Sequence, residues 1–158
     1  NTIALTYAKM YIDGRNKNDI ISLNEYVTEI IQGLVNNLST KQIQIRQNIN
    51  TVNCSLDLAI PIGLITNEII TNSLKHAFED SLTPTIYITL KQTANDIYFS
   101  IGDNGVGPGA DFSLENKNSL GSKIIFLLSK QMNAHLELSL EQGLVYTFRI
   151  STNKTAKQ

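Results

Sequence analysis

The sequence has little cysteine and no excess of charge of either sign. Cys54 is the only cysteine among 158 residues, which excludes an internal disulfide framework and a cysteine metal cluster. We expect Cys54 to be a small buried residue and the chain to suit a reducing cytoplasm. Thirteen basic residues stand against fourteen acidic ones, so the formal net charge is -1. With no field to gather nucleic acid or an anionic membrane, polyanion binding is not expected as the main function.

Long apolar runs are also missing. None approaches the roughly 20 residues that cross a bilayer, so we expect no membrane-inserted segment in this chain. The start, Asn1 to Leu5, has neither an initiator methionine nor the pattern of a signal peptide. Two interpretations of this start stay open, a piece cut from a longer protein and a processed chain. We expect the chain to be cytoplasmic, and the sequence leaves the membrane attachment of a longer parent protein open.

Enough apolar material is present for one core. At 158 residues and 42% hydrophobic composition, the chain is long enough for one sizeable domain and too short for two ordinary ones. We expect this domain to occupy residues 19–152. Residues 1–18 would be the remnant of a preceding helix with its connector, and 153–158 a tail.

The spacing of apolar residues predicts three helices and three pairs of strands. Helical spacing covers about 23–38, Pro61 to Phe78 and about 120–132. The predicted strands are 42–49, 52–56, 85–91, 96–101, 135–141 and 144–151. Helices interleaved with antiparallel hairpins favour an α+β fold over a doubly wound parallel sheet. We expect a two-layer α/β sandwich with one mixed, mostly antiparallel sheet and the helices on one face.

The central predicted helix has a dense polar edge within the longest apolar stripe of the chain. At about 100° per residue, Glu68, Asn72 and Lys75 fall within one narrow arc, and His76 follows. Polar side chains in a buried helix need an explanation. From this segment alone two interpretations stay open, a binding site or the ordinary solvent-facing side of an amphipathic helix.

Two glycine-containing segments follow. Asp103, Gly105 and Gly107 come directly after a predicted strand, where an acid can accept a hydrogen bond from a base edge and glycines let a ligand approach the backbone. Ser119 to Lys123 opens the next predicted helix, whose unpaired N–H groups favour a phosphate. Taken singly, the first segment is a weak signal, because most such strings are turns. The second can equally be read as a plain serine cap.

Together and in order, the three segments resemble the N box and the two glycine boxes of the GHKL superfamily, which is shared by histidine kinases, gyrase, chaperone ATPases and the MutL repair proteins. The resemblance covers residues 58–150. The string from Leu58 to Phe78 is similar to the sensor histidine kinases whose N box ends in Asn-x-x-Lys-His, the HWE-like subfamily. The resemblance implies the Bergerat ATP-binding fold, with ATP and Mg²⁺ as cofactors.

The resemblance also implies roles for the polar helix edge. Asn72 would hold Mg²⁺ through its side-chain oxygen, a hard donor suited to a hard cation. Glu68 would orient or deprotonate the attacking group or a metal-bound water. Lys75 and His76 would offset phosphate charge. Glu68, Lys75 and His76 are therefore the candidate catalytic residues.

The glycine boxes would bind the nucleotide. By the resemblance, Asp103 accepts from the adenine amino group, while Gly105 and Gly107 shape the pocket floor. The helix start at Ser119, Leu120 and Gly121 would meet the phosphates, and about 108–120 would form a mobile cover.

Some residues depart from the family pattern or carry no predicted chemistry. Leu144 stands after Gly143 where the family commonly has a threonine that helps to hold adenine, which puts that polar contact in doubt. Lys123 is expected to face solvent, and His135 to be a packing or surface residue. The aromatic residues at strand spacing are expected to be sheet core and rim: Tyr87, Tyr98, Phe99, Tyr146 and Phe148.

The function implied is that of the catalytic ATP-binding domain of a two-component sensor histidine kinase. The γ-phosphate would pass to a histidine on a dimerisation domain that this chain lacks, and then to a response regulator. As a fragment, the chain would be incomplete for autophosphorylation. Two alternatives stay open, a GHKL-type ATPase that drives a conformational clamp and a pseudokinase module that binds nucleotide without chemistry.

Overall fold

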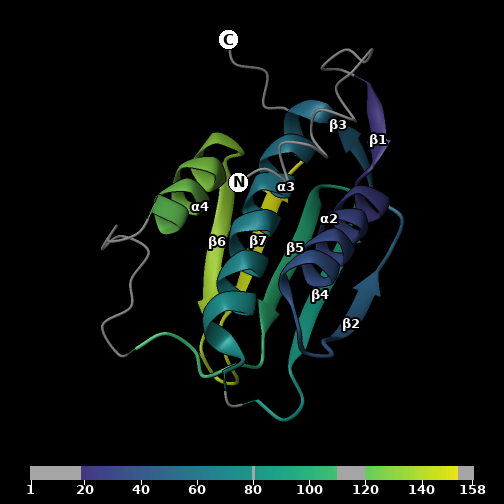
Figure 1. The fold of residues 1–158 in the computed structure, drawn as a ribbon. Helices are drawn as coiled ribbons and strands as arrows, with labels where there is room; N and C mark the ends of the chain where they lie inside the picture. The colour runs from purple at the N-terminus through teal and green to yellow at the C-terminus, as the bar shows by residue number, and fades with distance from the viewer. Residues whose placement is uncertain (1–18, 80, 110–119, 153–158) are drawn as a thin grey trace.

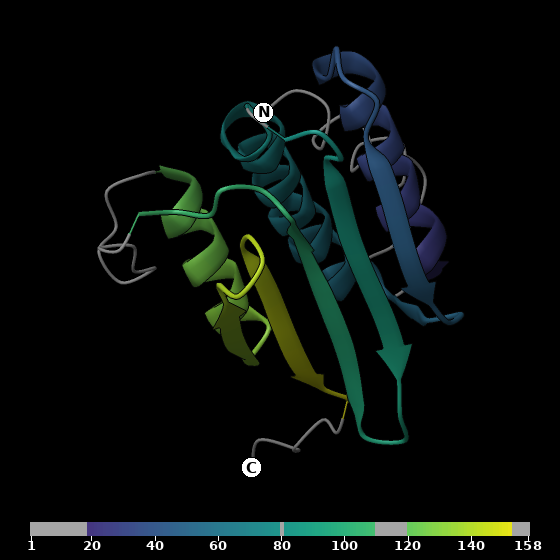
Figure 2. The same ribbon diagram turned by 90° about the horizontal axis from the view of Figure 1, so that it is seen from below.

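The computed structural model describes residues 19–79, 81–109 and 120–152. One five-stranded sheet carries three helices on one of its faces, and no helix or strand among these residues covers the other face (Figures 1 and 2). The helices are α2 (Leu23–Leu38), α3 (Leu56–Asn72) and α4 (Leu120–Gln131). The predicted α+β sandwich with helices on one face of a mixed sheet is confirmed.

The sheet has the strand order β2-β4-β5-β7-β6. Its strands are β2 (Gln44–Ile49), β4 (Thr85–Gln92), β5 (Asp96–Asp103), β6 (Ala134–Ser139) and β7 (Val145–Ser151). β2 pairs with β4 in parallel, and the other three pairings are antiparallel. In the centre, β5 and β7 pair so that Ile101 lies opposite Tyr146, which places the carboxyl end of β5 beside the start of β7.

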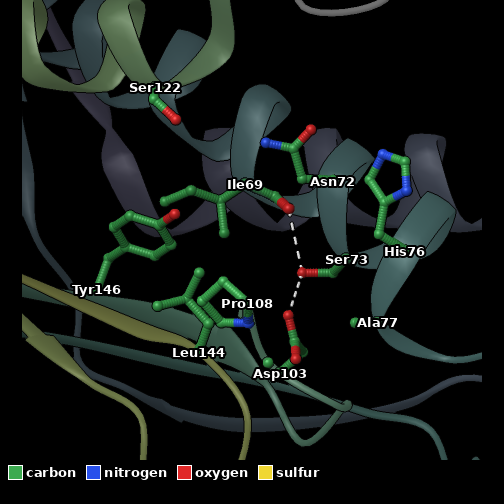
Figure 3. A pocket seen from close by; sticks show the side chains of 11 residues that line it. Ile69, Asn72, Ser73, His76, Ala77, Asp103, Pro108, Ser122, Leu144 and Tyr146 are labelled. Carbon is green, nitrogen blue, oxygen red and sulfur yellow. Dashed lines mark hydrogen bonds between the residues drawn. The ribbon is translucent and has the colours of Figure 1, made fainter. Parts of the chain in front are cut away.

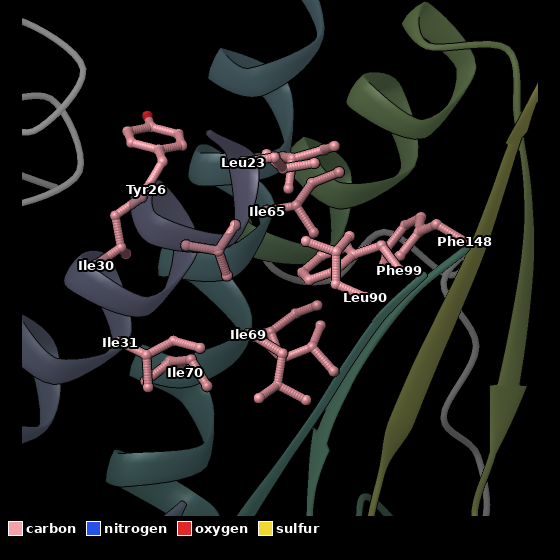
Figure 4. Packing of buried hydrophobic residues seen from close by; sticks show 14 of the residues in the cluster. Leu23, Tyr26, Ile30, Ile31, Ile65, Ile69, Ile70, Leu90, Phe99 and Phe148 are labelled. Atoms are coloured by element: carbon pink, nitrogen blue, oxygen red, sulfur yellow. The ribbon is translucent and has the colours of Figure 1, made fainter. Parts of the chain in front are cut away.

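The core lies between the sheet and the helices (Figure 4). Alternate residues of the strands point into it, so that Leu90 and Phe99 meet the α3 residues Ile65 and Ile69 while their neighbours face outward. α2 packs closely on α3, where a Cβ built at Gly63 would lie 2.4 Å from the hydroxyl of Tyr26. On this face of the sheet α3 lies between α2 and α4 (Figure 1).

The first predicted helix is confirmed at both of its bounds, but the start of the central helix was placed too late. α3 begins at Leu56, and Pro61 lies inside it. Asp57 in the first turn favours a helix start because its charge complements the helix dipole. Pro61 is tolerated in the second turn, where its missing N–H leaves only the Asp57 carbonyl without its intrahelical partner.

Two elements were not predicted. β1 (Ile20–Ser22) pairs antiparallel with β3 (Asn53–Ser55) in a separate two-stranded sheet, so the strands do not all belong to one sheet. The end of the central helix is a π-helical turn, η1 (Ser73–Ala77).

The predicted helix remnant, tail and most of the predicted cover lie outside the described residues. Within the described part, no helix is both long enough and apolar enough to cross a membrane.

Candidate functional site

A cavity of about 260 Å³ opens between the end of α3, the turn η1 and the loop after β5 (Figure 3). Its walls come from segments that are distant in the sequence and present mostly apolar surface. The lining residues are Ile69, Asn72, Ser73, His76, Ala77, Asp103, Gly107, Pro108, Ser122, Leu144 and Tyr146. The cavity therefore unites the predicted polar helix edge with the first glycine segment.

Asp103 is a buried carboxylate at this cavity, with 4% of its surface exposed. It is the last residue of β5, which fixes its backbone, and its N–H donates to the carbonyl of Leu144 at 3.2 Å. Oδ1 accepts from the N–H of Gly105 at 2.9 Å, and Oδ2 accepts from the hydroxyl of Ser73 at 2.5 Å. A carboxylate has about four acceptor positions, so capacity remains for a ligand donor.

Two glycines allow the backbone to close around Asp103. A Cβ at Gly105 would lie 2.2 Å from the carbonyl oxygen of Ala77, and the next residue, Val106, donates its N–H to that same oxygen at 3.1 Å. Gly143 has φ +100, and a Cβ there would lie 2.1 Å from the carbonyl oxygen of Asp103. Both positions need glycine because no larger residue fits.

The start of α4 lies against the polar edge of α3. A Cβ built at Gly121 would lie 3.0 Å from Oε2 of Glu68 and 3.5 Å from Nδ2 of Asn72. Leu120 is exposed at the first position of α4, and Ser119 lies outside the described residues. Glu68 accepts a hydrogen bond from Asn67 at 3.3 Å and does not line the cavity. Gly121 thus keeps open a small space bordered by a carboxylate and an amide.

The turn η1 separates the two basic candidates. Both residues are exposed, but only His76 lines the cavity. A π-helical turn closes its hydrogen bonds over five residues, so each residue advances by less than the 100° assumed from the sequence. His76 thus lines the cavity together with Asn72, four residues before it. The Nζ of Lys41 donates to the carbonyls of Phe78 and Glu79, both at 2.6 Å, and secures the end of the turn.

Several lining residues were not predicted as part of the site, and two of them, Ser73 and Tyr146, have hydroxyl groups close to it. Ser73 had no signal, since only the folded chain brings it to Asp103. Tyr146 was expected in the sheet core, and its burial confirms that, but its ring also forms a wall of the cavity. Burial, and secondly the charge of Asp103, raises the pKa of the Tyr146 hydroxyl well above its usual range. Leu144, the residue that departs from the family pattern, lines the same cavity as Tyr146 with an apolar side chain.

Two residues outside the site behave as predicted. Lys123 is exposed on α4. His135 lies on the surface of β6, with its Nε2 3.2 Å from Oε1 of Glu137.

Comparison with known proteins relates the chain to histidine kinases. No family model matches it. It is 27% identical over 140 residues to blue-light-activated histidine kinase 2 of Erythrobacter litoralis (strain HTCC2594), a match that covers 87% of this chain and 40% of that protein. The chain thus spans less than half the length of this relative.

Solved structures share the fold. The histidine kinase domain of the Erythrobacter litoralis EL346 blue-light-activated histidine kinase has a TM-score of 0.83 at 24% identity, with 93% of this chain and 75% of that chain covered. Full-length ShkA in complex with AMPPNP has a TM-score of 0.65 at 15% identity, with 94% of this chain and 34% of that chain covered.

The fold is that of histidine kinase catalytic domains. In sequence, the chain is related to a blue-light-activated histidine kinase. The resemblance found in the three sequence segments is confirmed.

Proposed function

We propose that this chain is the ATP-binding catalytic domain of a two-component sensor histidine kinase. It would transfer the γ-phosphate of Mg-ATP to a histidine on a separate dimerisation domain of the same protein, for passage to a response regulator in the cytoplasm. The observation that carries the proposal is the buried carboxylate of Asp103 in a mostly apolar cavity beside Asn72. The relationship to histidine kinases, and AMPPNP in the complex of ShkA, support it.

The cavity suits an adenine base. Ile69, Ala77 and Leu144 offer apolar walls for a flat ring, and Asp103 is a fixed acceptor for its amino group. A few placed polar groups in an apolar pocket are the usual design of a site that selects a small ligand. Gly105 and Gly107 would form the floor, where the backbone of the loop lies close to η1.

The space at Gly121 suits phosphates and Mg²⁺. Mg²⁺ is usually held by one or two protein oxygens together with waters and phosphate oxygens, and Asn72 and Glu68 offer such donors. In the described part of the chain no group of three or more His, Cys, Asp or Glu side chains forms a metal site, so phosphates would complete the coordination. The N–H groups at the start of α4, at Leu120 and Gly121, would bind phosphate oxygens.

Catalysis would rest on positioning and on offsetting charge. Bound Mg²⁺ would neutralise charge that develops on the phosphates. Glu68 would orient or deprotonate the imidazole that attacks the γ-phosphate. His76, which lines the cavity, and Lys75, on the exposed side of η1, would add positive charge near the phosphates.

Calorimetric titration of the chain with ATP, with and without Mg²⁺, tests the binding part. We expect Asp103→Ala to abolish binding, and Asn72→Ala to remove its dependence on Mg²⁺. Asn72 is exposed, so its variant should fold like the wild type. Asp96→Ala is a matched control, because Asp96 pairs with Arg149 at the other end of β5. If the wild type does not bind ATP under either condition, the proposal is wrong.

Phosphotransfer needs an acceptor domain. With labelled Mg-ATP and a dimerisation domain added in trans, we expect label on its histidine as an acid-labile, base-stable phosphoramidate. Glu68→Gln should bind ATP like the wild type and lose transfer. Release of inorganic phosphate without labelled histidine would instead support an ATPase, and binding without turnover a pseudokinase.

A further inference from the structure

Tyr146 has a buried ring and a hydroxyl without a hydrogen-bond partner in the described part of the chain. Only 4% of its surface is exposed, and it lines the cavity with Asp103. No hydrogen bond joins its hydroxyl to any of residues 19–79, 81–109 or 120–152. In the described part of the chain no fully buried side-chain N or O atom lacks a hydrogen-bond partner, so this unpaired hydroxyl is accessible from the cavity. Tyrosine hydroxyls on buried rings usually have a hydrogen-bond partner. Its hydroxyl is therefore free to donate to a ligand bound in this cavity.

Packing fixes the direction of this hydroxyl. The ring of Tyr146 stacks on Phe148 with centroids 6.5 Å apart and planes 7° apart, and Phe148 stacks on Phe99 at 5.9 Å. The ring cannot turn without disturbing these core residues. Figure 3 shows its oxygen on the side of Ile69 and Ser122, within the cavity.

The sheet register places the hydroxyl in reach of a ligand held by Asp103. Tyr146 pairs with Ile101, and Asp103 is the next residue of β5 on the same face. Such diagonal neighbours lie roughly 7–8 Å apart along the backbone, and both residues line the same cavity. The two side chains therefore face a shared ligand from adjacent strands.

The two groups have complementary chemistry. Burial and the nearby charge of Asp103 both raise the pKa of Tyr146, so the hydroxyl keeps its proton near neutral pH and can donate. Asp103, as a carboxylate, can only accept. One acceptor and one donor match adenine, whose amino group donates while its ring nitrogens accept. Guanine presents a carbonyl acceptor where adenine has its amino group, so it would face the carboxylate unfavourably.

We propose that Tyr146 is a specificity-determining residue, whose hydroxyl donates a hydrogen bond to a ring nitrogen next to the amino group of an adenine held by Asp103. This inference rests on the proposed function. It also accounts for Leu144, because the polar contact that a threonine would make at that position is supplied two residues later on β7.

The test is Tyr146→Phe, which removes the hydroxyl and keeps the stacked ring. Calorimetry should give a dissociation constant for ATP about three- to tenfold weaker than that of the wild type, the effect of one net hydrogen bond. 7-Deaza-ATP and 1-deaza-ATP each lack one of the two ring nitrogens. With one of these analogues, the variant and the wild type should bind equally, since the hydroxyl has lost its acceptor there.

Controls separate this result from a change in folding. Tyr87→Phe, on β4 outside the cavity, should leave ATP affinity unchanged. Tyr146→Phe should unfold at about the same urea concentration as the wild type without nucleotide, because it keeps the stacked ring and removes a hydroxyl that bonds to no other described residue. Equal ATP affinity of Tyr146→Phe and wild type would overturn the inference alone, as would an equal loss for ATP and both analogues. A wild type that binds no ATP would instead overturn the proposed function, and the inference with it.

Discussion

The carboxylate of Asp103 is held by the hydroxyl of Ser73, with Oγ 2.5 Å from Oδ2. This bond joins the end of β5 to the first residue of the π-helical turn. The hydroxyl has one hydrogen and also lies 3.1 Å from the carbonyl of Ile69, but the charged oxygen is the nearer acceptor (Figure 3). The group proposed to select adenine and the turn that carries His76 are thus coupled through one serine.

Ser73→Ala should destabilise the protein by about 1–2 kcal/mol, because it removes a hydrogen bond to a buried charged group. Urea unfolding measures the change. Ser129→Ala is a matched control, since Ser129 is an equally buried helical serine that bonds only to the carbonyl of Phe126 at 2.8 Å. If both variants lose the same unfolding free energy, the contact with Asp103 adds no stability beyond that of a hydrogen bond from a serine to a carbonyl of its own helix.

Gly105→Ala should destabilise the protein by about 2 kcal/mol or more, because its Cβ would lie 2.2 Å from the backbone oxygen of Ala77. The loop or η1 would have to move, and nucleotide affinity should fall with stability. Gly109→Ala is the comparison, since no atom lies within 4 Å of a Cβ at Gly109. A fully stable Gly105→Ala variant would show that the loop does not need this close approach.

Cys54 should make stability fall in alkaline solution. Burial raises the pKa of its thiol to about 12, from 9.0 for an accessible cysteine. Above pH 9 the unfolded chain loses this proton while the folded chain keeps it, so unfolding becomes more favourable by about 1.4 kcal/mol per pH unit until the folded pKa is reached. Below pH 9 the term is constant.

Urea unfolding of wild type and Cys54→Ala between pH 8 and 10.5 isolates this contribution. The difference in unfolding free energy between the two proteins should stay constant up to about pH 9 and then change in favour of the variant. A constant difference over the whole range would mean that the thiol titrates alike in both states. Iodoacetamide should accordingly label native Cys54 slowly at pH 8.

Sequence reasoning predicted the elements that local periodicity determines. The helix Leu23–Leu38 and the hairpin of β4 and β5 follow from apolar spacing over single segments. Asn72 and Asp103 were found as candidates because each stands in a distinctive string of residues, and the fold brings both to one cavity.

What the sequence did not predict depends on contacts between segments or on departures from regular geometry. Ser73 and Tyr146 reach the cavity only when β5 and β7 pair beneath η1. The π-helical turn that carries Lys75 and His76 was also not predicted, because the sequence was counted at 100° per residue, as in a regular α-helix. A three-residue strand such as β1 carries too few residues to show alternation.

Gly121→Ala should separate folding from Mg-ATP binding. Alanine is favoured over glycine in a helix by up to about 1 kcal/mol, and the oxygen of Glu68 that its Cβ meets at 3.0 Å ends a flexible side chain. Thermal unfolding without nucleotide should therefore occur at the same or a higher temperature. The methyl group would fill the space between Glu68 and Asn72 that we assign to phosphates and Mg²⁺, so affinity for Mg-ATP should fall at least tenfold, about 1.4 kcal/mol. Adenosine, which lacks phosphates, should bind wild type and variant equally, and an undiminished affinity for Mg-ATP would place the phosphates elsewhere.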